Sequence, residues 1–435
     1  MRKISTVILK FFLVFLFCSN LTAGSIFITP GAKANAMGGA FSAVADDITA
    51  IYWNPAGLSQ LQGNGFGLSA FYVSKNAKSN TSLANTAVPD NADGDFPIAL
   101  LSAVEPTMFE SKKFETSAFL PFAAGYTNIN DITLAVGFYA IGGGGGKWED
   151  SVTDLSATGT IDASIDASYG FMVGNISASK YLSDKLSLGL GLNLIYMINQ
   201  ANVKKAYTAG STTVYSIEQD LDAAGTGFEV TAGALFHLTE TIQLGGVFRS
   251  GASVNLDGTS KLNTLGLGPA IPDMNYSTDY EQEYAYPLSY GIGLAYLPTE
   301  LLILSVALDM TNHSVVKDDI DYEQEIAGLI DDVNSKKGWE DTTQIRLGCD
   351  YMLTEKISLR GGVEIDPAPT PSGKLTLIST EQYSFTSLCL GMGYTLEKIQ
   401  LDMNYIHSFD DNPESNNRSY EYPLDIVRIT IGYNF

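Results

Sequence analysis

A strict two-residue alternation of apolar with small or polar side chains is the feature that most constrains this 435-residue chain. Leu or Tyr occupies every even position from 186 to 196, with Ser, Gly or Asn at the odd positions from 187 to 193, and apolar residues recur at even positions of 288–296 and 302–310. Side chains alternate between the faces of a β-strand, so each run predicts a strand with one apolar face. That face would point into the core of a soluble sandwich or toward lipid in an outer-membrane barrel.

The number and spacing of these runs favour the barrel. Tight links such as Asn128–Asp131, Leu182–Lys185 and Thr354–Lys356 alternate with long polar ones, and bacterial outer-membrane barrels have this asymmetry and an even number of strands. We therefore expect an all-β fold, a transmembrane antiparallel β-barrel of about 14 strands. The strand candidates begin near Phe66, Phe114, Ile132, Tyr169, Leu186, Gly227, Ile242, Tyr284, Leu301, Thr342, Ile357, Phe385, Ile399 and Tyr420.

The C-terminal run supports the same fold. Apolar residues stand at every second position from Val427 to the terminal Phe435, and a final aromatic is similar to the signal that outer-membrane proteins present to the barrel assembly machinery. An edge strand that merely stops there is the alternative. In a barrel this last strand must pair with the first, because an open sheet edge cannot face lipid.

Composition excludes several classes of function. With 25 Lys and Arg against 48 Asp and Glu, the net charge of −23 disfavours a nucleic-acid partner. The three His are scattered without metal-ligand spacing, and no nucleophile elbow is present, so we expect neither a cofactor nor an enzyme. Asp90, Asp93 and Asp95 could hold Ca²⁺, although a solvated loop is the simpler interpretation.

The first 23 residues are typical of a secretory signal peptide. Arg2, Lys3 and Lys10 precede an apolar run from Phe11 to Phe17, and small residues follow as far as Ala23. The apolar run is shorter than the roughly 20 residues that a transmembrane helix requires. We expect cleavage near Ala23, so that the mature protein is exported.

The segment that follows, residues 24–62, is predicted to form a small plug before a barrel at residues 63–435. Gly38 and Gly39 permit a tight turn, and Asn54 followed by Pro55 reads as an N-cap and a first helical residue. The first βα unit of a soluble domain would read similarly. However, the pieces MGGAF, AVADD and WNPAGL resemble the N-terminal hatch of the FadL/TodX family of outer-membrane transporters for fatty acids and other hydrophobic compounds.

The resemblance extends along most of the mature chain. Segments that are similar to family barrel strands begin at Phe138 (FYAIGGGGGKW), Tyr181 (YLSDKLSLGLGL), Gly338 (GWEDTTQIRLGCDY), Lys356 (KISLRGGVEIDPAP) and Leu390 (LGMGYTLEKIQLDMNY). One departure concerns the third strand: many relatives have a Pro-Phe-Gly turn after it, whereas this chain has five glycines at 142–146. The departure puts the local geometry, and with it the ligand path, in doubt.

The resemblance implies passive uptake of hydrophobic small molecules, such as long-chain fatty acids, through the outer membrane of a diderm bacterium. The expected partners are a fatty acid or hydrocarbon ligand, outer-membrane lipids and lipopolysaccharide, and the assembly machinery. In this mechanism an extracellular apolar site captures the ligand, a lumen pocket accepts it, and the hatch or a kinked third strand gates its release. Two alternatives stay open: a structural partner of a secretion or surface-attachment machine, and a general diffusion porin, which the hatch should block.

Candidate site residues follow from these patterns. An unusually apolar loop, 255–279, suggests capture of ligand, and inward-pointing arginines could pair with a ligand carboxylate or with one another's acidic neighbours. For ligand binding we expect Ile26, Phe27 and Ile28 near the mature N-terminus, Leu262, Leu265 and Leu267 in the loop, and the inward Arg249, Arg346 and Arg360, with Arg428 on the same face. For gating we expect Asn54, Pro55 and Ala56 in the hatch and Gly137, Gly142 and Gly143 in the third strand, although a flexible loop is the alternative for the later glycines.

Overall fold

The computed structural model describes residues 29–79, 112–154, 159–267, 271–326, 329–371, 384–410, 414–415, 418–421 and 424–435. The predicted signal peptide, the ligand-binding candidates Ile26, Phe27 and Ile28, and the acidic segment at Asp90–Asp95 lie outside these residues. No helix in the described part of the chain is both long and apolar enough to cross a membrane.

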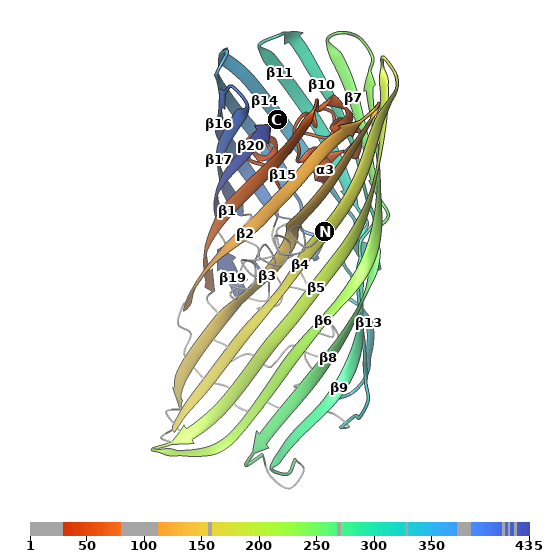
Figure 1. The fold of residues 1–435 in the computed structure, drawn as a ribbon. Coiled ribbons are helices and arrows are strands. Elements are labelled where there is room, and N and C mark those ends of the chain that lie inside the picture. The colour runs from red at the N-terminus through yellow and green to blue at the C-terminus, as the bar shows by residue number, and fades with distance from the viewer. Residues whose placement is uncertain are drawn as a thin grey trace.

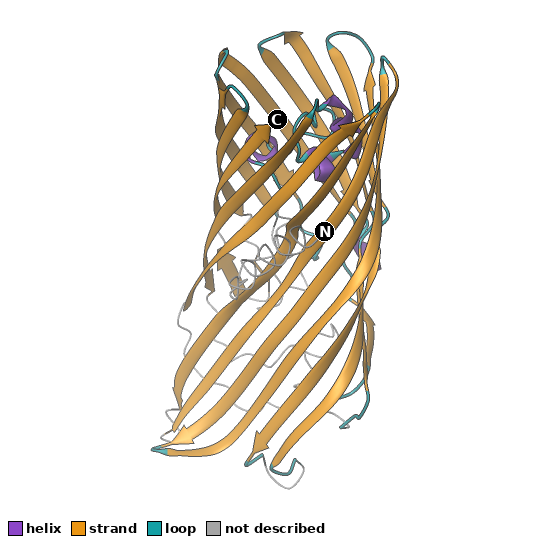
Figure 2. Ribbon diagram, in the orientation of Figure 1, coloured by secondary structure: helices purple, strands orange, loops and turns teal. Residues whose placement is uncertain are grey.

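One antiparallel sheet closes on itself as a barrel (Figures 1 and 2). We call each pass of the chain along the barrel wall a stave. Ten staves are single, uninterrupted strands: β1 (Asn64–Ser79), β2 (Lys112–Ile129), β3 (Ile132–Asp154), β4 (Gly159–Ser183), β5 (Leu186–Ala209), β6 (Thr212–His237), β15 (Ile357–Asp366), β16 (Phe385–Leu396), β17 (Ile399–Asp410) and β20 (Leu424–Asn434). Four more are interrupted strands: β7 (Ile242–Arg249) with β8 (Ala252–Leu265), β9 (Met274–Tyr286) with β10 (Ser289–Thr299), β11 (Leu302–Thr311) with β12 (Lys317–Tyr322), and β13 (Val333–Lys336) with β14 (Thr342–Thr354). The expected 14-strand barrel is therefore confirmed.

The first and last staves close the barrel. β1 and β20 pair from Gly65–Asn434 to Lys75–Leu424, and the backbone N–H of Phe435 donates to the carbonyl of Asn64 at 2.8 Å. Short strands β18 (Glu414–Ser415) and β19 (Arg418–Glu421) continue this side, with β19 pairing to the far end of β1. Because the ladder is closed, no edge strand exposes backbone N–H and C=O groups to lipid, which could not form hydrogen bonds with them.

The apolar face of the strands points outward. Leu188, Leu190, Leu192 and Leu194 of β5 are exposed, while the residues between them face the interior. This arrangement rules out the soluble sandwich, in which the same leucines would be buried. The outer surface forms the apolar band that contacts lipid in an outer-membrane barrel.

One wall of the barrel is much taller than the other (Figure 1). β3 to β6 have 23–26 residues, whereas β15, β16, β17 and β20 have 10–12. Even positions of β5 face outward along its whole length, but the polarity of the two faces is exchanged beyond the lipid band: the outward positions there include Gln200 and Lys204, and the inward ones include Ala201 and Val203. The predicted starts of β4 and β6, Tyr169 and Gly227, were therefore too late, because the extensions are apolar inside rather than outside.

The hatch lies inside the barrel, at the end where the tight turns and the C-terminus are found (Figures 1 and 2). It contains α2 (Ala32–Ala36), α3 (Ala50–Trp53) and the 3₁₀ helix η1 (Pro55–Gln60), and β1 follows at Asn64. A further 3₁₀ turn, η4 (His313–Val315), joins β11 to β12. Most hatch residues are buried, so the plug fills this end of the lumen.

Candidate transport path

Glycines of the inner wall allow the hatch backbone to lie directly against the strands. A Cβ atom at Gly189 of β5 would lie 2.2 Å from the carbonyl carbon of Pro55, and one at Gly233 of β6 would lie 2.1 Å from Asn54 Oδ1. Such distances are far below van der Waals contact, so a side chain at either position would displace the plug. The close approach of the hatch backbone to the wall thus explains part of the small residues that alternate with leucine along β5.

Asn54 both caps a helix and attaches it to the wall. Its Oδ1 accepts from the N–H of Ala56 at 3.1 Å, while Nδ2 donates to the carbonyls of Ser42 at 2.7 Å and Ala234 at 3.1 Å. The N-cap predicted at Asn54, with Pro55 as the first helical residue, is present, and the helix is 3₁₀. The carbonyl of Ala56 in turn accepts from the hydroxyls of Ser179 and Ser187 on β4 and β5.

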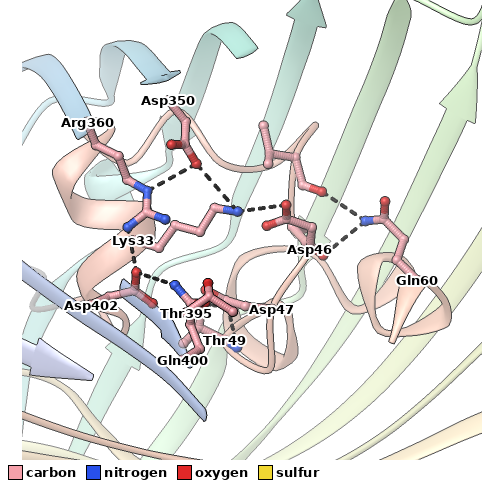
Figure 3. A network of polar contacts seen from close by, with 12 residues as sticks. Lys33, Asp46, Asp47, Thr49, Gln60, Asp350, Arg360, Thr395, Gln400 and Asp402 are labelled. Atoms are coloured by element: carbon pink, nitrogen blue, oxygen red, sulfur yellow. Dashed lines mark hydrogen bonds and ion pairs between the residues drawn. The ribbon is translucent and has the colours of Figure 1, made fainter. Parts of the chain in front are cut away.

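A chain of ion pairs joins the hatch to the opposite wall (Figure 3). Lys33 Nζ of α2 lies 2.7 Å from Asp46 and 3.6 Å from Asp350 of β14. Arg360 of β15 bridges Asp350 at 3.0 Å and Asp402 of β17 at 2.5 Å. Charges in such a buried setting persist only when they are paired, so breaking the chain would be costly.

Asp47 adds a group that titrates near neutrality to this end of the hatch. Its Oδ1 accepts from the backbone N–H of Thr49 at 2.7 Å, just before α3. Burial, followed by the repulsion of neighbouring Asp46, raises the pKa of the Asp47 carboxyl to about 6, while Thr49 and Lys33 act in the opposite direction. The charge of Asp47 therefore changes as the pH passes through about 6.

Two further arginines of the inner wall contact the hatch, and one of them also pairs with carboxylates of neighbouring strands. Arg346 lies 2.9 Å from both Asp309 and Glu364, and its guanidinium stacks 5.5 Å from the ring of Trp53. Arg249 Nη2 donates to the carbonyl of Tyr52 at 2.6 Å, with the guanidinium 4.8 Å from the Tyr52 ring. Arg249, Arg346 and Arg360 all face the lumen as expected, and their contacts are to the hatch and wall; a ligand-binding role for them stays a prediction.

A continuous apolar cluster runs inside the tall wall, from the hatch to the far end of the barrel. At the hatch it includes Tyr52 and Trp53, and the Tyr139 ring on β3 meets Tyr52 edge-to-face at 6.1 Å. Beyond them, its buried members include Phe122, Phe171, Ile195, Met197, Val203, Ile217, Val254, Leu256 and Leu262 on strands, and Ile271, Leu329 and Ile330 in the connections between strands. We call this set the apolar track. A water-filled porin would have a polar lumen instead.

The far end of the apolar track lies between β8 and β9. Residues 255–279 were expected to form a loop, but most of them belong to these two strands, which pair from Ala252–Tyr286 to Thr264–Met274. The loop prediction was wrong because the interrupted staves continue beyond the lipid band, after a break at Gly251 with φ of 66°. Leu262 is buried and Leu267 packs on the track, whereas Leu265 is 42% exposed.

The barrel wall divides between β2 and β3. Their ladder runs from Ile129–Ile132 to Phe122–Tyr139, and among the described residues it goes no further, although both strands continue. Beyond that point β2 pairs with β1, and β3 pairs with β4 after a bulge at Ile141. The gap begins beside Tyr139, at the hatch end of the apolar track.

The predicted gating glycines lie along this part of β3. Gly137 faces the hatch, where a Cβ atom would lie 3.0 Å from Ile51 Cδ1. Gly142 and Gly143 follow the bulge, and all five glycines from 142 to 146 pair with β4, so the alternative of a flexible surface loop does not hold for them. A gating role for these residues stays a prediction.

The sequence did not indicate several aromatic members of the site. Tyr52, Phe122, Tyr139 and Phe171 line the junction of hatch, track and gap, and none of them was among the predicted site residues. The sequence did hold one signal: the aromatic residues of β2, β3 and β4 stand at positions that face the lumen. An aromatic side chain there has no lipid to contact and therefore needs another apolar partner.

These features define a class of protein: an outer-membrane β-barrel of the transport type, with a plug inside the lumen. The family described as outer membrane protein transport protein (OMPP1/FadL/TodX) matches residues 20–427. This protein belongs to that family, and its location is the outer membrane.

The curated and solved relatives are distant in sequence. Outer membrane protein P1 of Haemophilus influenzae is 21% identical over 404 residues, which cover 84% of this chain and 81% of that protein. A FadL homologue from Pseudomonas aeruginosa superposes with a TM-score of 0.72 at 16% identity, covering 95% of this chain and 100% of the other. The toluene transporter TodX of Pseudomonas putida gives 0.68 at 16% identity, with 95% and 100% covered. At these identities the structural likeness supports the fold.

Proposed function

We propose that this protein takes up hydrophobic small molecules, such as long-chain fatty acids, passively across the outer membrane. The proposal rests on the apolar track, along which a hydrophobic solute could keep contact with apolar side chains from the far end of the barrel to the hatch. An amphiphile cannot readily cross the polar outer leaflet unaided, and the track replaces water along that route. The names of the relatives, among them toluene transporters, are consistent with cargo of this kind.

The gap between β2 and β3 supports release sideways through the wall. It begins next to Tyr139 and Phe122, which lie at the hatch end of the track, and the adjacent outer positions Val136 and Phe138 are exposed to lipid. A ligand leaving there passes from apolar side chains into the membrane without meeting bulk water. The hatch, held by Asn54 and the ion pairs, then serves mainly to seal the lumen against hydrophilic solutes.

Uptake into proteoliposomes tests this function directly. The assay compares a radiolabelled long-chain fatty acid with a hydrophilic solute of similar mass, using the purified full-length protein. Met197→Gln, which places an amide in the track with nearly unchanged volume, is expected to slow fatty-acid uptake severalfold. Met352→Gln, at an exposed position outside the track, is the matched control. Equal uptake of both solutes by the wild type would refute the proposal.

A further inference from the structure

Four neighbouring staves of the barrel are interrupted in the same row of the sheet. Their strands on the hatch side, β7, β10, β11 and β14, stop at one row of paired residues: Arg249, Ser289, Thr311 and Thr342. Beyond that row the staves are interrupted at 250–251, 287–288, 312–316 and 337–341. The break therefore widens from two residues to five across the sheet, as expected of a hinge that opens at one end.

The narrow end of the break contains residues that favour a bend. Gly251 has a φ of 66°, and Pro287 has no backbone N–H to donate to a ladder. At the wide end one exposed carboxylate replaces most of the ladder: Asp341 accepts from Asn312 Nδ2 at 2.8 Å and from the N–H of Ser314 at 3.0 Å. Water competes for such exposed bonds, so the wide end opens at small cost.

Beyond the break lie β8, β9, β12 and β13, which we call the lid (Figure 1). On one side the lid continues the tall wall, because β8 pairs with β6 from Thr226–Asn255 to Ser216–Leu265. On the other side β13 is the last strand, and among the described residues its only ladder is with β12. The lid is therefore held along one side and free along the other, and the break is widest next to the free side.

The inner face of the lid lies against the inner face of the tall wall. The ring centre of Phe171 on β4 lies 5.4 Å from that of Tyr284 and 5.5 Å from that of Tyr286, both on β9. Nearby, Asn199 of β5 donates to Gln282 of β9 at 3.4 Å. Because β6 and β8 separate β5 from β9 in the sheet, these contacts cross the lumen. The lid is thus closed over this part of the apolar track.

The lid and the wall each supply part of the apolar track. Val254, Leu256 and Leu262 belong to the lid, and Phe171 and Met197 belong to the wall. Where the two faces bury each other, a hydrophobic molecule reaches the track only if the lid moves away from the wall. Opening exposes apolar side chains to water, which is unfavourable unless a ligand covers them. A hydrophobic ligand therefore binds the open lid better and shifts the equilibrium toward opening.

We propose that the lid opens about the break to admit hydrophobic molecules to the apolar track and closes again behind them. The proposal rests on the uptake function proposed above. In this mechanism the contact of Phe171 with Tyr284 and Tyr286 holds the lid shut, and the break gives the lid its freedom to move. A fixed trough without a moving part is the alternative.

A reversible cross-link tests the movement. Asn199→Cys with Gln282→Cys, in a background with Cys349→Ala and Cys389→Ala, places one thiol on the wall and one on the lid, and a bifunctional methanethiosulfonate joins them. Uptake of a radiolabelled fatty acid into proteoliposomes should fall about tenfold and return when a reductant cleaves the link.

Two controls accompany the cross-link. A monofunctional methanethiosulfonate on the same two thiols adds the bulk without the link and should leave uptake well above that of the cross-linked protein. The bifunctional reagent on Lys204→Cys with Glu218→Cys, which are neighbours on the outer face of β5 and β6, should not change uptake.

Distances between spin labels report the movement without a cross-link. One label stands on Lys336→Cys of the lid and the other on Gln200→Cys of the wall, both at exposed positions. The ligand-free protein should show one main distance, with the open lid in fewer than about a tenth of the molecules. A saturating fatty acid should raise the fraction with a longer distance severalfold. Labels on Glu240→Cys and Glu355→Cys, in two exposed turns at the hatch end, should give one unchanged distance.

The possible outcomes separate the lid from the uptake function. Undiminished uptake by the cross-linked protein, or label distances that the fatty acid leaves unchanged, refutes the lid and leaves the proposed function intact. An equal decrease with the monofunctional reagent would show obstruction of the track and refute movement as the cause. No uptake by the wild type refutes the proposed function itself. If the variant with cysteines at 199 and 282 does not fold, the label distances decide.

Discussion

Asn54 in the hatch and Ala234 in β6 are joined by a hydrogen bond of 3.1 Å, across 180 positions of the sequence. The same side chain caps η1, so one residue sets both the local helix and its place against the wall. Asn54→Asp separates these roles, because a carboxylate can still accept from Ala56 but cannot donate to Ser42 or Ala234.

We expect Asn54→Asp to leave the barrel assembled and to open a leak for small hydrophilic solutes. The cap on Ala56 is kept, but the two donated hydrogen bonds are lost and a carboxylate then faces the carbonyls of Ser42 and Ala234. This repulsion suffices to shift a plug between arrangements of similar energy. Leak is measured as single-channel conductance per folded barrel, and the double variant Asn54→Ala, Pro55→Ala is measured in parallel. A hatch that only assists folding would instead give low yield with unchanged conductance per molecule.

The leak should depend on pH through Asp47. Because its pKa is raised to about 6 in the seated hatch, the stabilisation from protonated Asp47 is complete below its ordinary pKa and is lost as the pH rises through about 6. Conductance of the wild type should therefore increase between pH 5 and pH 7.5. Asp47→Asn retains the acceptor for Thr49 and should remove the dependence; a variant with the wild-type pH profile would exclude Asp47 as its cause.

Arg346 is expected to contribute strongly to stability. Arg346→Met leaves Asp309 and Glu364 largely buried without a partner, which should lower the free energy of unfolding by about 3 kcal/mol. Urea unfolding in lipid vesicles measures the loss. Adding Asp309→Asn and Glu364→Gln to Arg346→Met should recover part of it, because no unpaired charge then remains. No recovery would place the contribution of Arg346 in its stacking on Trp53.

The terminal aromatic is expected to matter for assembly. Phe435 is 66% exposed, its ring lies 6.1 Å from Phe66 and 5.2 Å from Tyr433, and its N–H completes the β1–β20 closure. Deleting Phe435 should reduce the amount of heat-modifiable, folded barrel in the membrane, and Phe435→Tyr should restore it. Normal levels of folded protein after the deletion would show that the residue is not a signal.

Capture of ligand is expected at the tip of the β8–β9 hairpin. Leu265→Ser together with Leu267→Ser should lower uptake at limiting substrate, because Leu265 is exposed and Leu267 touches the apolar track. The control is Val315→Ser, an exposed apolar residue on η4. Uptake equal to that of the control would remove the hairpin from the mechanism.

Most of the barrel could be predicted because lipid and lumen impose opposite demands on alternate residues. Leu188 and Leu190 face lipid, and Gly189 faces the hatch, so the pattern alone places them. The prediction failed beyond the lipid band, where the apolar residues stand at inward positions and the polar residues at outward ones. For this reason β4 and β6 were predicted too short, and most residues of β8 and β9 were predicted to form a loop. The composition of these segments is as polar as that of a loop, and their inward apolar residues become recognisable only when the neighbouring strand is known.

The site was harder to predict than the fold, because its features depend on partners far apart in sequence. Alternation places Arg346, Arg360 and Arg428 on one face, yet cannot reveal that the first two meet carboxylates and the third meets Phe71. The β2–β3 gap depends on the register of two ladders and on the bulge at Ile141. Glycines at 142–146 suggested irregularity near this point but not its form.

Deletion of Ile141 tests whether hydrophobic molecules leave the lumen through the gap that begins at Phe122 and Tyr139. Removing the bulge residue should bring the far part of β3 back into register with β2 and close the wall. The measurement is fatty-acid uptake into proteoliposomes per folded barrel. We predict at least a tenfold decrease with unchanged hydrophilic leak, whereas wild-type uptake through a barrel shown to be closed between β2 and β3 would exclude release through this gap.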